Sequence, residues 1–148
     1  MDFVLSKEQE MARQLFRDFA EKEVKPLAQE VDEEERFPAE TVAKMQKFGF
    51  MGIPFPKDMG GQGCDSLTYA ICVEELSRVC ATTGVIVSAH TSLGCDPIKK
   101  FGTPEQIKKY LVPMAQGKLL GAFGLTEPNA GTDASGQQTK AVLEGDHY

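Results

Sequence analysis

The chain has 148 residues, of which 41% are hydrophobic and 26% are charged, so its composition fits one domain with a sizeable core. Its 22 acidic and 16 basic residues leave a net charge of −6, which argues against binding to nucleic acid or to an anionic membrane, because both require a basic surface. The sequence has neither a signal-peptide pattern nor the roughly 20 apolar residues of a membrane span, so it predicts a cytoplasmic protein without a membrane anchor.

Five helical segments are predicted before the pattern becomes strand-like. Ser6 begins a capping box at the start of the first segment, and apolar residues recur at helical spacing after it. Pro26 interrupts this pattern, but helical spacing resumes for one or two turns up to a solvated acidic run at 32–35. Pro38 opens the second helix, and Gly49 suits the position just beyond its end.

The next region, 51–64, is rich in proline and glycine and is predicted to be a loop. Its G-G-Q-G run at 60–63 differs from a dinucleotide-binding loop, because no strand precedes it and the glycine spacing does not match. A third helix follows this loop, with Asp65 or Ser66 as its cap.

The fourth helix, at about 82–101, is apolar on nearly all sides. We therefore expect it to be buried on most sides, with Val85 and Leu93 in the core. Thr103 begins a second capping box, with proline at the first helical position, and launches a fifth helix that Gly117 can end.

The cysteine pattern predicts no metal site and favours a reducing compartment. The chain contains four cysteines but no Cys-x-x-Cys pair, and only two histidines could serve as further ligands. Cys72 and Cys80 lie within a helical pattern. A thiol in such a position usually acts as a small buried hydrophobic group rather than as a redox centre.

From residue 119 the pattern becomes strand-like. Two strands are predicted, at 119–125 and 138–143, and a hairpin signal follows at 145–146. Between the strands, Pro128, Asn129 and Gly131 favour a turn with positive φ. Because a lone hairpin is marginal in water, we expect an incomplete second domain.

The turn that follows the first predicted strand carries the strongest functional signal. It would direct backbone N–H groups and the hydroxyls of Thr126 and Thr132 toward one point. This arrangement suits a ligand with acceptor atoms along an edge and phosphates beyond it, so the residues predict a nucleotide or flavin site. The alternative is that the two hydroxyls only satisfy the backbone of their own turn.

The run L-T-E-P-N-A-G-T-D, which begins at Leu125, resembles the signature of the acyl-CoA dehydrogenase family, and of its short-chain (butyryl-CoA) dehydrogenases in particular. The resemblance extends over the whole chain and includes the loop P-K-D-M-G-G-Q-G at 56–63. It implies a mainly α fold, with an N-terminal helical bundle at 1–118 and the first strands of a β-domain at 119–148. The family's glutamate base would then lie beyond Tyr148, so we expect no catalytic residue within the chain and no activity from this chain alone.

The resemblance also implies a reaction, in which FAD accepts the electrons as a short-chain acyl-CoA becomes the 2,3-enoyl-CoA. It implies electron-transfer flavoprotein as a partner and a homo-oligomer as the complete enzyme. The flavin-contacting residues would be Phe123, Leu125, Thr126, Gly131 and Thr132. The substrate-binding residues would be Ile86, Ala89, His90 and Thr132.

Three alternatives accompany this interpretation. An inward-pointing His90 would shorten the acyl cavity, whereas a satisfied surface histidine would have no such role. If the chain alone were active, Glu127 beside the turn would be the first candidate for the base. The fold is also compatible with an acyl-CoA oxidase, with a flavin monooxygenase, or with a non-catalytic helical interaction module.

Overall fold

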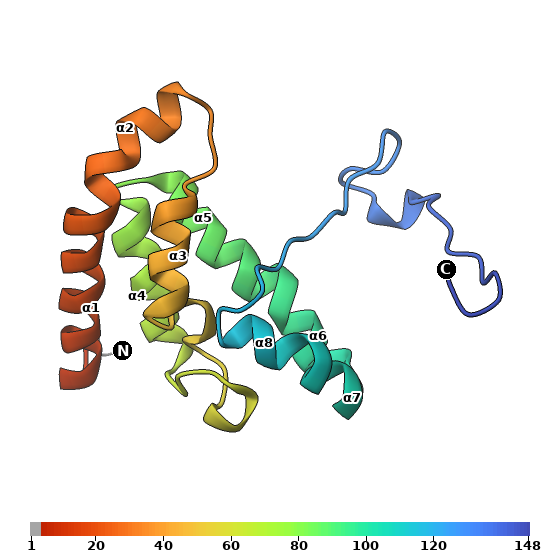
Figure 1. Ribbon diagram of the computed structural model, residues 1–148, viewed down its shortest axis with the longest axis horizontal. Helices are drawn as coiled ribbons and strands as arrows, with labels where there is room; N and C mark the ends of the chain where they lie inside the picture. Colours follow the sequence, from red (N-terminus) through yellow and green to blue (C-terminus); the bar gives the residue numbers. More distant parts are fainter. Residues whose placement is uncertain (1–3) are drawn as a thin grey trace.

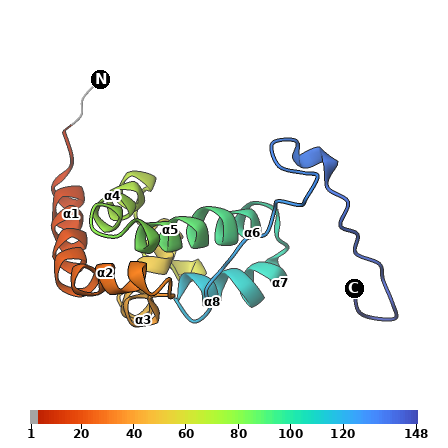
Figure 2. The same ribbon diagram turned by 90° about the horizontal axis from the view of Figure 1, so that it is seen from above.

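The computed structural model describes residues 4–148, which form a helical bundle followed by a segment without regular structure that leads away from it (Figures 1 and 2). Helix α1 (Lys7–Phe19) continues through a π-helical turn (Ala20–Val24) into α2 (Lys25–Glu33). The predicted capping box is confirmed, because the side chains of Ser6 and Gln9 each accept the other residue's backbone N–H. The helical direction persists through Pro26, which lies in the first turn of α2, where proline is tolerated.

Helix α3 (Ala39–Lys47) ends at the predicted glycine, since Gly49 adopts a φ of 79°. The predicted loop contains two short 3-10 turns, Phe50–Gly52 and Lys57–Met59. Helix α4 (Ser66–Ser77) follows it. Its cap is Asp65 rather than Ser66, because the Asp65 carboxylate accepts the N–H of Thr68 at 2.7 Å.

The fourth predicted helix consists of α5 (Ala81–Ala89), a π-helical turn (His90–Cys95) and α6 (Asp96–Phe101). The expectation that it is buried on most sides is wrong. Val85 is 61% exposed and Leu93 is 46% exposed, so neither lies in the expected core position. The helix packs on α4 and lies along the outside of the bundle, so one face stays open (Figure 2).

The fifth helical segment begins with the predicted capping box of Thr103 and Gln106. It runs through α7 (Pro104–Gln106), a π-helical turn (Ile107–Leu111) and α8 (Val112–Ala115). Gly117, with a φ of 71°, ends it as predicted.

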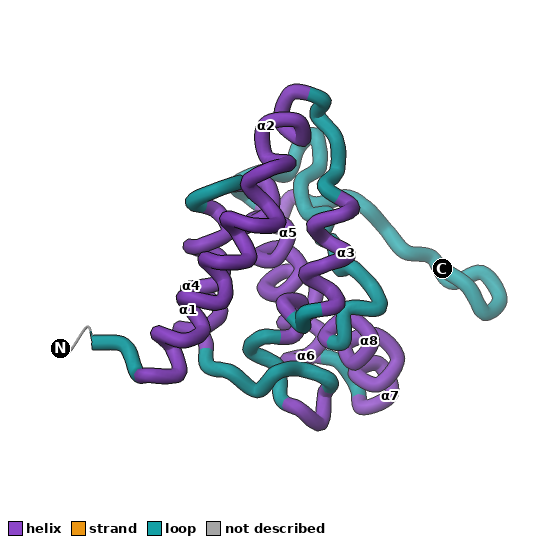
Figure 3. Tube along the Cα trace, turned by 60° about the vertical axis from the view of Figure 1, so that its left-hand side comes forward, coloured by secondary structure: helices purple, strands orange, loops and turns teal. Residues whose placement is uncertain are grey.

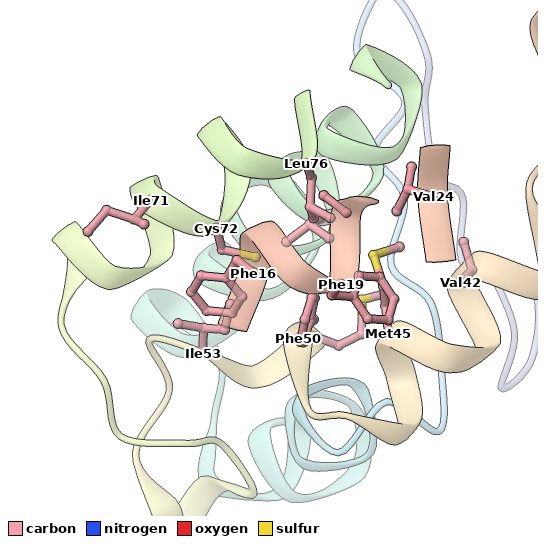
Figure 4. Close-up of a cluster of buried hydrophobic side chains, with 13 residues drawn as sticks. Phe16, Phe19, Val24, Val42, Met45, Phe50, Ile53, Ile71, Cys72 and Leu76 are labelled. Atoms are coloured by element: carbon pink, nitrogen blue, oxygen red, sulfur yellow. The ribbon is translucent and has the colours of Figure 1, made fainter. Parts of the chain in front are cut away.

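The bundle encloses two apolar clusters. In the larger one, the ring of Phe50 lies 5.1 Å from that of Phe16 and 4.7 Å from that of Phe19, so the turn after α3 packs against α1 (Figure 4). The smaller cluster joins the loop to the fourth and fifth helical segments, and its buried members are Phe55, Cys95, Leu111, Met114 and Ala115.

The predicted strands are absent from residues 119–148, which carry only isolated bridges and one 3-10 turn (Ala134–Gly136) (Figure 3). A strand requires backbone hydrogen bonds to a neighbouring strand, and residues 119–125 have no such neighbour in the described chain. The predicted turns do form, since bridges join Glu127 to Ala130 and Glu144 to His147. Gly131 does not adopt the expected positive φ, because the first turn closes before it.

Among the described residues, every buried apolar side chain except Ala130 lies at or before residue 115. The hydrophobic core therefore belongs to the helical part of the chain. This distribution supports the proposed boundary between a helical domain at 1–118 and the segment 119–148.

Candidate functional site

The segment with the predicted ligand-binding turn leaves the bundle at Gly121. The Gly121 N–H donates a hydrogen bond to Nδ1 of His90, with 2.9 Å between the two nitrogens. Gly121 also lies against Gly94 and Met114, and a Cβ atom at Gly121 would be 2.3 Å from the Met114 Cε. The backbone approaches the bundle this closely because residue 121 has no side chain.

A second set of contacts holds the other end of this segment. The Gln137 side chain donates to the Leu125 carbonyl oxygen at 2.5 Å, and the Glu127 carboxylate accepts the N–H groups of Gln138 at 2.7 Å and of Thr139 at 3.1 Å. These contacts frame a hollow of about 350 Å³. Its lining residues are Gly124, Leu125, Thr126, Glu127, Gln137 and Thr139.

All five predicted flavin contacts lie on exposed parts of this segment. The backbone N–H groups of residues 122–126 and the hydroxyls of Thr126 and Thr132 have no hydrogen-bond partner within residues 4–148. In this structure the two hydroxyls therefore do not satisfy their own turn. Exposed apolar side chains beside free donors fit a flat, largely apolar ring with acceptor atoms at its edge, so the residues present suit a flavin.

Glu127 is an unsuitable base in this arrangement. The backbone N–H groups of Gln138 and Thr139 hold the pKa of the Glu127 carboxyl below its usual value, because they stabilise the charged form. A carboxylate held in this way accepts a proton less readily. Its role here is to join the turn to residues 138 and 139.

The predicted substrate residues are not brought together with Thr132 in one hollow. Ile86 and Ala89 are half-buried on α5, where Ile86 packs against the larger apolar cluster. His90 is fully buried, and its ring nitrogens contact Gly121 and Met51, so it neither lines a cavity nor lies at the surface. No pattern in the sequence indicates the hydrogen bond to Gly121, because it joins residues 31 positions apart.

A different cleft, of about 410 Å³, lies between the loop after α3, the start of α4 and the region 91–100. It combines apolar, hydroxyl and charged side chains. Its lining residues are Pro54, Phe55, Ser66, Tyr69, Thr91, Ser92, Asp96, Lys99 and Lys100. None of the predicted substrate residues belongs to this set.

The cysteines follow the predicted pattern in part. Cys72 and Cys95 are buried, whereas Cys80 is half-buried, and Cys64 is exposed. Burial raises the pKa of the Cys95 thiol to about 12, so the group is uncharged at neutral pH. Within residues 4–148, no group of three metal-ligating side chains is placed to hold a metal ion, and no helix has the length and apolar character needed to cross a membrane.

Comparison with known proteins places this site in a family context. Residues 6–118 match the family described as "Acyl-CoA dehydrogenase, N-terminal domain". The chain is 65% identical over 148 residues to the short-chain specific acyl-CoA dehydrogenase of Clostridium acetobutylicum, with 100% of this chain and 39% of that protein covered.

Two solved structures share the fold. Butyryl-CoA dehydrogenase from Megasphaera elsdenii matches with a TM-score of 0.88 and 44% identity, over 94% of this chain and 37% of that chain. Acyl-CoA dehydrogenase from Bacillus anthracis, complexed with FAD, matches with a TM-score of 0.83 and 34% identity, over 90% of this chain and 23% of that chain. This chain thus spans less than half the length of each of these relatives.

Proposed function

The chain belongs to the acyl-CoA dehydrogenase family, and we propose that it forms one side of the flavin and substrate site of a short-chain acyl-CoA dehydrogenase. The proposed reaction oxidises a short-chain acyl-CoA to the 2,3-enoyl-CoA. Bound FAD would supply the acceptor for the hydride that leaves the substrate. The observation that carries the proposal is the exposed run 122–126, with its apolar side chains and unpaired N–H groups.

The proposed flavin contacts follow from the chemistry of each residue. Phe123 is 51% exposed and Leu125 is 44% exposed, and both would pack against the apolar part of the ring. The Thr126 hydroxyl and the neighbouring amides would donate hydrogen bonds to its polar edge, where fixed donors stabilise developing negative charge. Gly131 and Thr132 would contact the cofactor beyond the turn, and Thr132 would also meet the CoA arm.

On the substrate side we propose contacts with Ile86, Ala89 and Thr132. Ile86 and Ala89 are only half-buried, so part of each side chain is open to a ligand. His90 is left out of this set because its buried ring contacts other residues of the chain. We assign the catalytic base to no residue among 4–148, and Glu127 in particular is engaged by two N–H groups.

We further propose electron-transfer flavoprotein as the electron acceptor and a homo-oligomer as the working form, and the family resemblance supports both. Bulk water must be excluded from the reacting carbons during dehydrogenation. A site assembled from several segments excludes water better than this exposed segment does. The cytoplasmic location stays a prediction.

The proposed function can be tested on the natural gene product that carries these 148 residues. The purified protein should contain FAD. It should also catalyse the oxidation of butyryl-CoA to the 2,3-enoyl-CoA with an artificial electron acceptor. Hydrogen peroxide formed with oxygen as acceptor would instead indicate an oxidase. A purified protein that neither binds FAD nor reacts with acyl-CoA would favour a non-catalytic helical module.

Replacing Thr126 with valine in that product should make the midpoint potential of the flavin more negative and leave the fold unchanged. Valine retains the branched shape but lacks the hydroxyl, so the reduced flavin loses one hydrogen bond, with a net contribution of about 0.5–1.5 kcal/mol. A potentiometric titration measures the shift. Gln138→Ala is the control, because it keeps the backbone N–H that donates to Glu127. Equal shifts of the midpoint potential in the two variants would show that the Thr126 hydroxyl does not bind the flavin edge.

A further inference from the structure

The buried histidine lies in one of the three π-helical turns among the described residues. His90 opens the π-helical turn (His90–Cys95) that joins α5 to α6. The wider turn places residues five positions apart on the same side, and the Cys95 Sγ lies 3.4 Å from Nε2 of His90. Inserted π-helical turns are frequent at functional sites, because they redirect side chains that a regular helix would place elsewhere.

The contacts of the imidazole ring define one protonation state. The Gly121 N–H can only donate, so Nδ1 must be the acceptor and carry no proton. The proton of the neutral ring is then on Nε2, which donates to the Met51 carbonyl oxygen at 3.2 Å. Burial lowers the pKa of His90 against the opposing effect of the Met51 and Met114 carbonyl oxygens, so the neutral form is favoured. The ring therefore joins two backbone segments that are far apart in the sequence.

Gly121 is also held by packing contacts beside this hydrogen bond. A Cβ atom added to Gly94 would lie 3.1 Å from the Gly121 Cα, so the two glycine backbones are in direct contact. Met114 also contacts Gly121, since its Cε would be 2.3 Å from a Cβ at Gly121. Gly121 thus lies in a socket formed by His90, Gly94 and Met114. Beyond the socket, the described structure gives residues 122–125 no backbone hydrogen bond to the bundle.

We propose that His90 is a positioning residue, which sets where the flavin-contacting segment leaves the helical bundle by accepting the hydrogen bond of the Gly121 amide. The inference rests on the proposed function of residues 122–126, but the hydrogen bond itself can be tested without a flavin. Phe123 follows Gly121 by two residues, so the direction of its side chain depends on the hydrogen bond between Gly121 and His90. His90 also directly follows Ala89, a proposed substrate contact, so one ring fixes the flavin side relative to the substrate side.

Two substitutions separate the roles of the two ring nitrogens. His90→Asn places an amide oxygen near the position of Nδ1, where it can accept the Gly121 N–H. His90→Gln places its amide near the position of Nε2, so it can donate to Met51 but leaves Gly121 without an acceptor. Thr91→Val is the matched control, because the Thr91 side chain is also buried in this turn and its hydroxyl has no hydrogen-bond partner within residues 4–148.

The first measurement is made on the 148-residue chain by NMR. The imidazole nitrogen shifts of the unmodified chain should report the tautomer with the proton on Nε2. Protection of the Gly121 amide from hydrogen exchange should fall about tenfold in His90→Gln, as expected when one hydrogen bond is lost, and should stay within about threefold in His90→Asn and Thr91→Val. A proton on Nδ1, or equal losses in His90→Asn and His90→Gln, would overturn the proposal. The tautomer measurement tests the hydrogen bond to Gly121 on the unmodified chain even if a variant does not fold.

The second measurement is the affinity of the natural gene product for FAD. His90→Gln should weaken FAD binding by about three- to tenfold, whereas His90→Asn and Thr91→Val should bind as the unmodified protein does. Unchanged affinity in His90→Gln, despite loss of Gly121 protection, would overturn the positioning role. If the natural gene product has no affinity for FAD, the proposed function is overturned. The NMR data would still show whether His90 accepts the Gly121 hydrogen bond.

Discussion

Replacement of Phe50 with alanine should lower the free energy of unfolding by about 3–5 kcal/mol, the usual range for a buried aromatic side chain. Phe50 is 2% exposed, and its ring contacts those of Phe16 and Phe19. Truncation removes this apolar contact and leaves a cavity between α1 and the turn after α3, which the rigid helices fill only in part. Urea unfolding of the 148-residue chain, followed by circular dichroism, measures the change.

Phe101→Ala is the control for this substitution. It deletes the same atoms from a side chain that is 86% exposed, so its effect should stay within about 0.5 kcal/mol. Similar losses in the two variants would mean that the packing of Phe50 against α1 does not determine the stability of the bundle.

Replacement of Glu75 with glutamine should cost about 2 kcal/mol, because it removes the charge that balances several arginines between α1 and α4. The Glu75 carboxylate is buried and accepts two hydrogen bonds from Arg17, at 2.7 and 3.0 Å, and one from Arg78 at 3.4 Å. We expect a smaller loss of unfolding free energy than for a fully buried ion pair, because the Arg17 side chain is 47% exposed and its charge can be solvated. Glu74→Gln is the control, since its side chain is 66% exposed.

The effect of Glu75 should also depend on pH. Hydrogen bonds from Arg17 hold the pKa of Glu75 below its ordinary value near 4.5 in the folded chain. A lowered folded-state pKa stabilises the protein above the unfolded-state pKa, and this contribution is lost as pH falls through the folded-state value. The difference in unfolding free energy between the unmodified chain and Glu75→Gln should therefore shrink between neutral pH and about pH 3. A difference that stays constant over this range would contradict the assigned role of the carboxylate.

The helix boundaries illustrate what could be predicted from the sequence. The capping boxes at Ser6 and Thr103 and the glycine ends at Gly49 and Gly117 all appear in the structure. Each depends on atoms within about four residues along the chain, so the local sequence contains all the partners. The family resemblance also needs no tertiary contact, because it lies in the order of residues along the whole chain, including the run from Leu125.

The candidate site could be predicted only in part. The sequence predicts the segment with Phe123 and Thr126 as the flavin-binding part, and both side chains are exposed in the structure. It did not identify the contacts that hold this segment, from His90 at one end and from Gln137 at the other. No periodicity or motif marks a hydrogen bond between a helical side chain and a distant loop amide.

The helix ends, the turns and the family resemblance can thus be predicted from the order of residues alone. The exposure of Val85 and Leu93, the absence of a strand at 119–125 and the burial of His90 next to Gly121 follow only from the folded arrangement. The difference arises from the distance along the chain between interacting partners. Caps and turns are closed by near neighbours, whereas burial, strand pairing and the acceptor of the Gly121 amide depend on segments that only folding brings together.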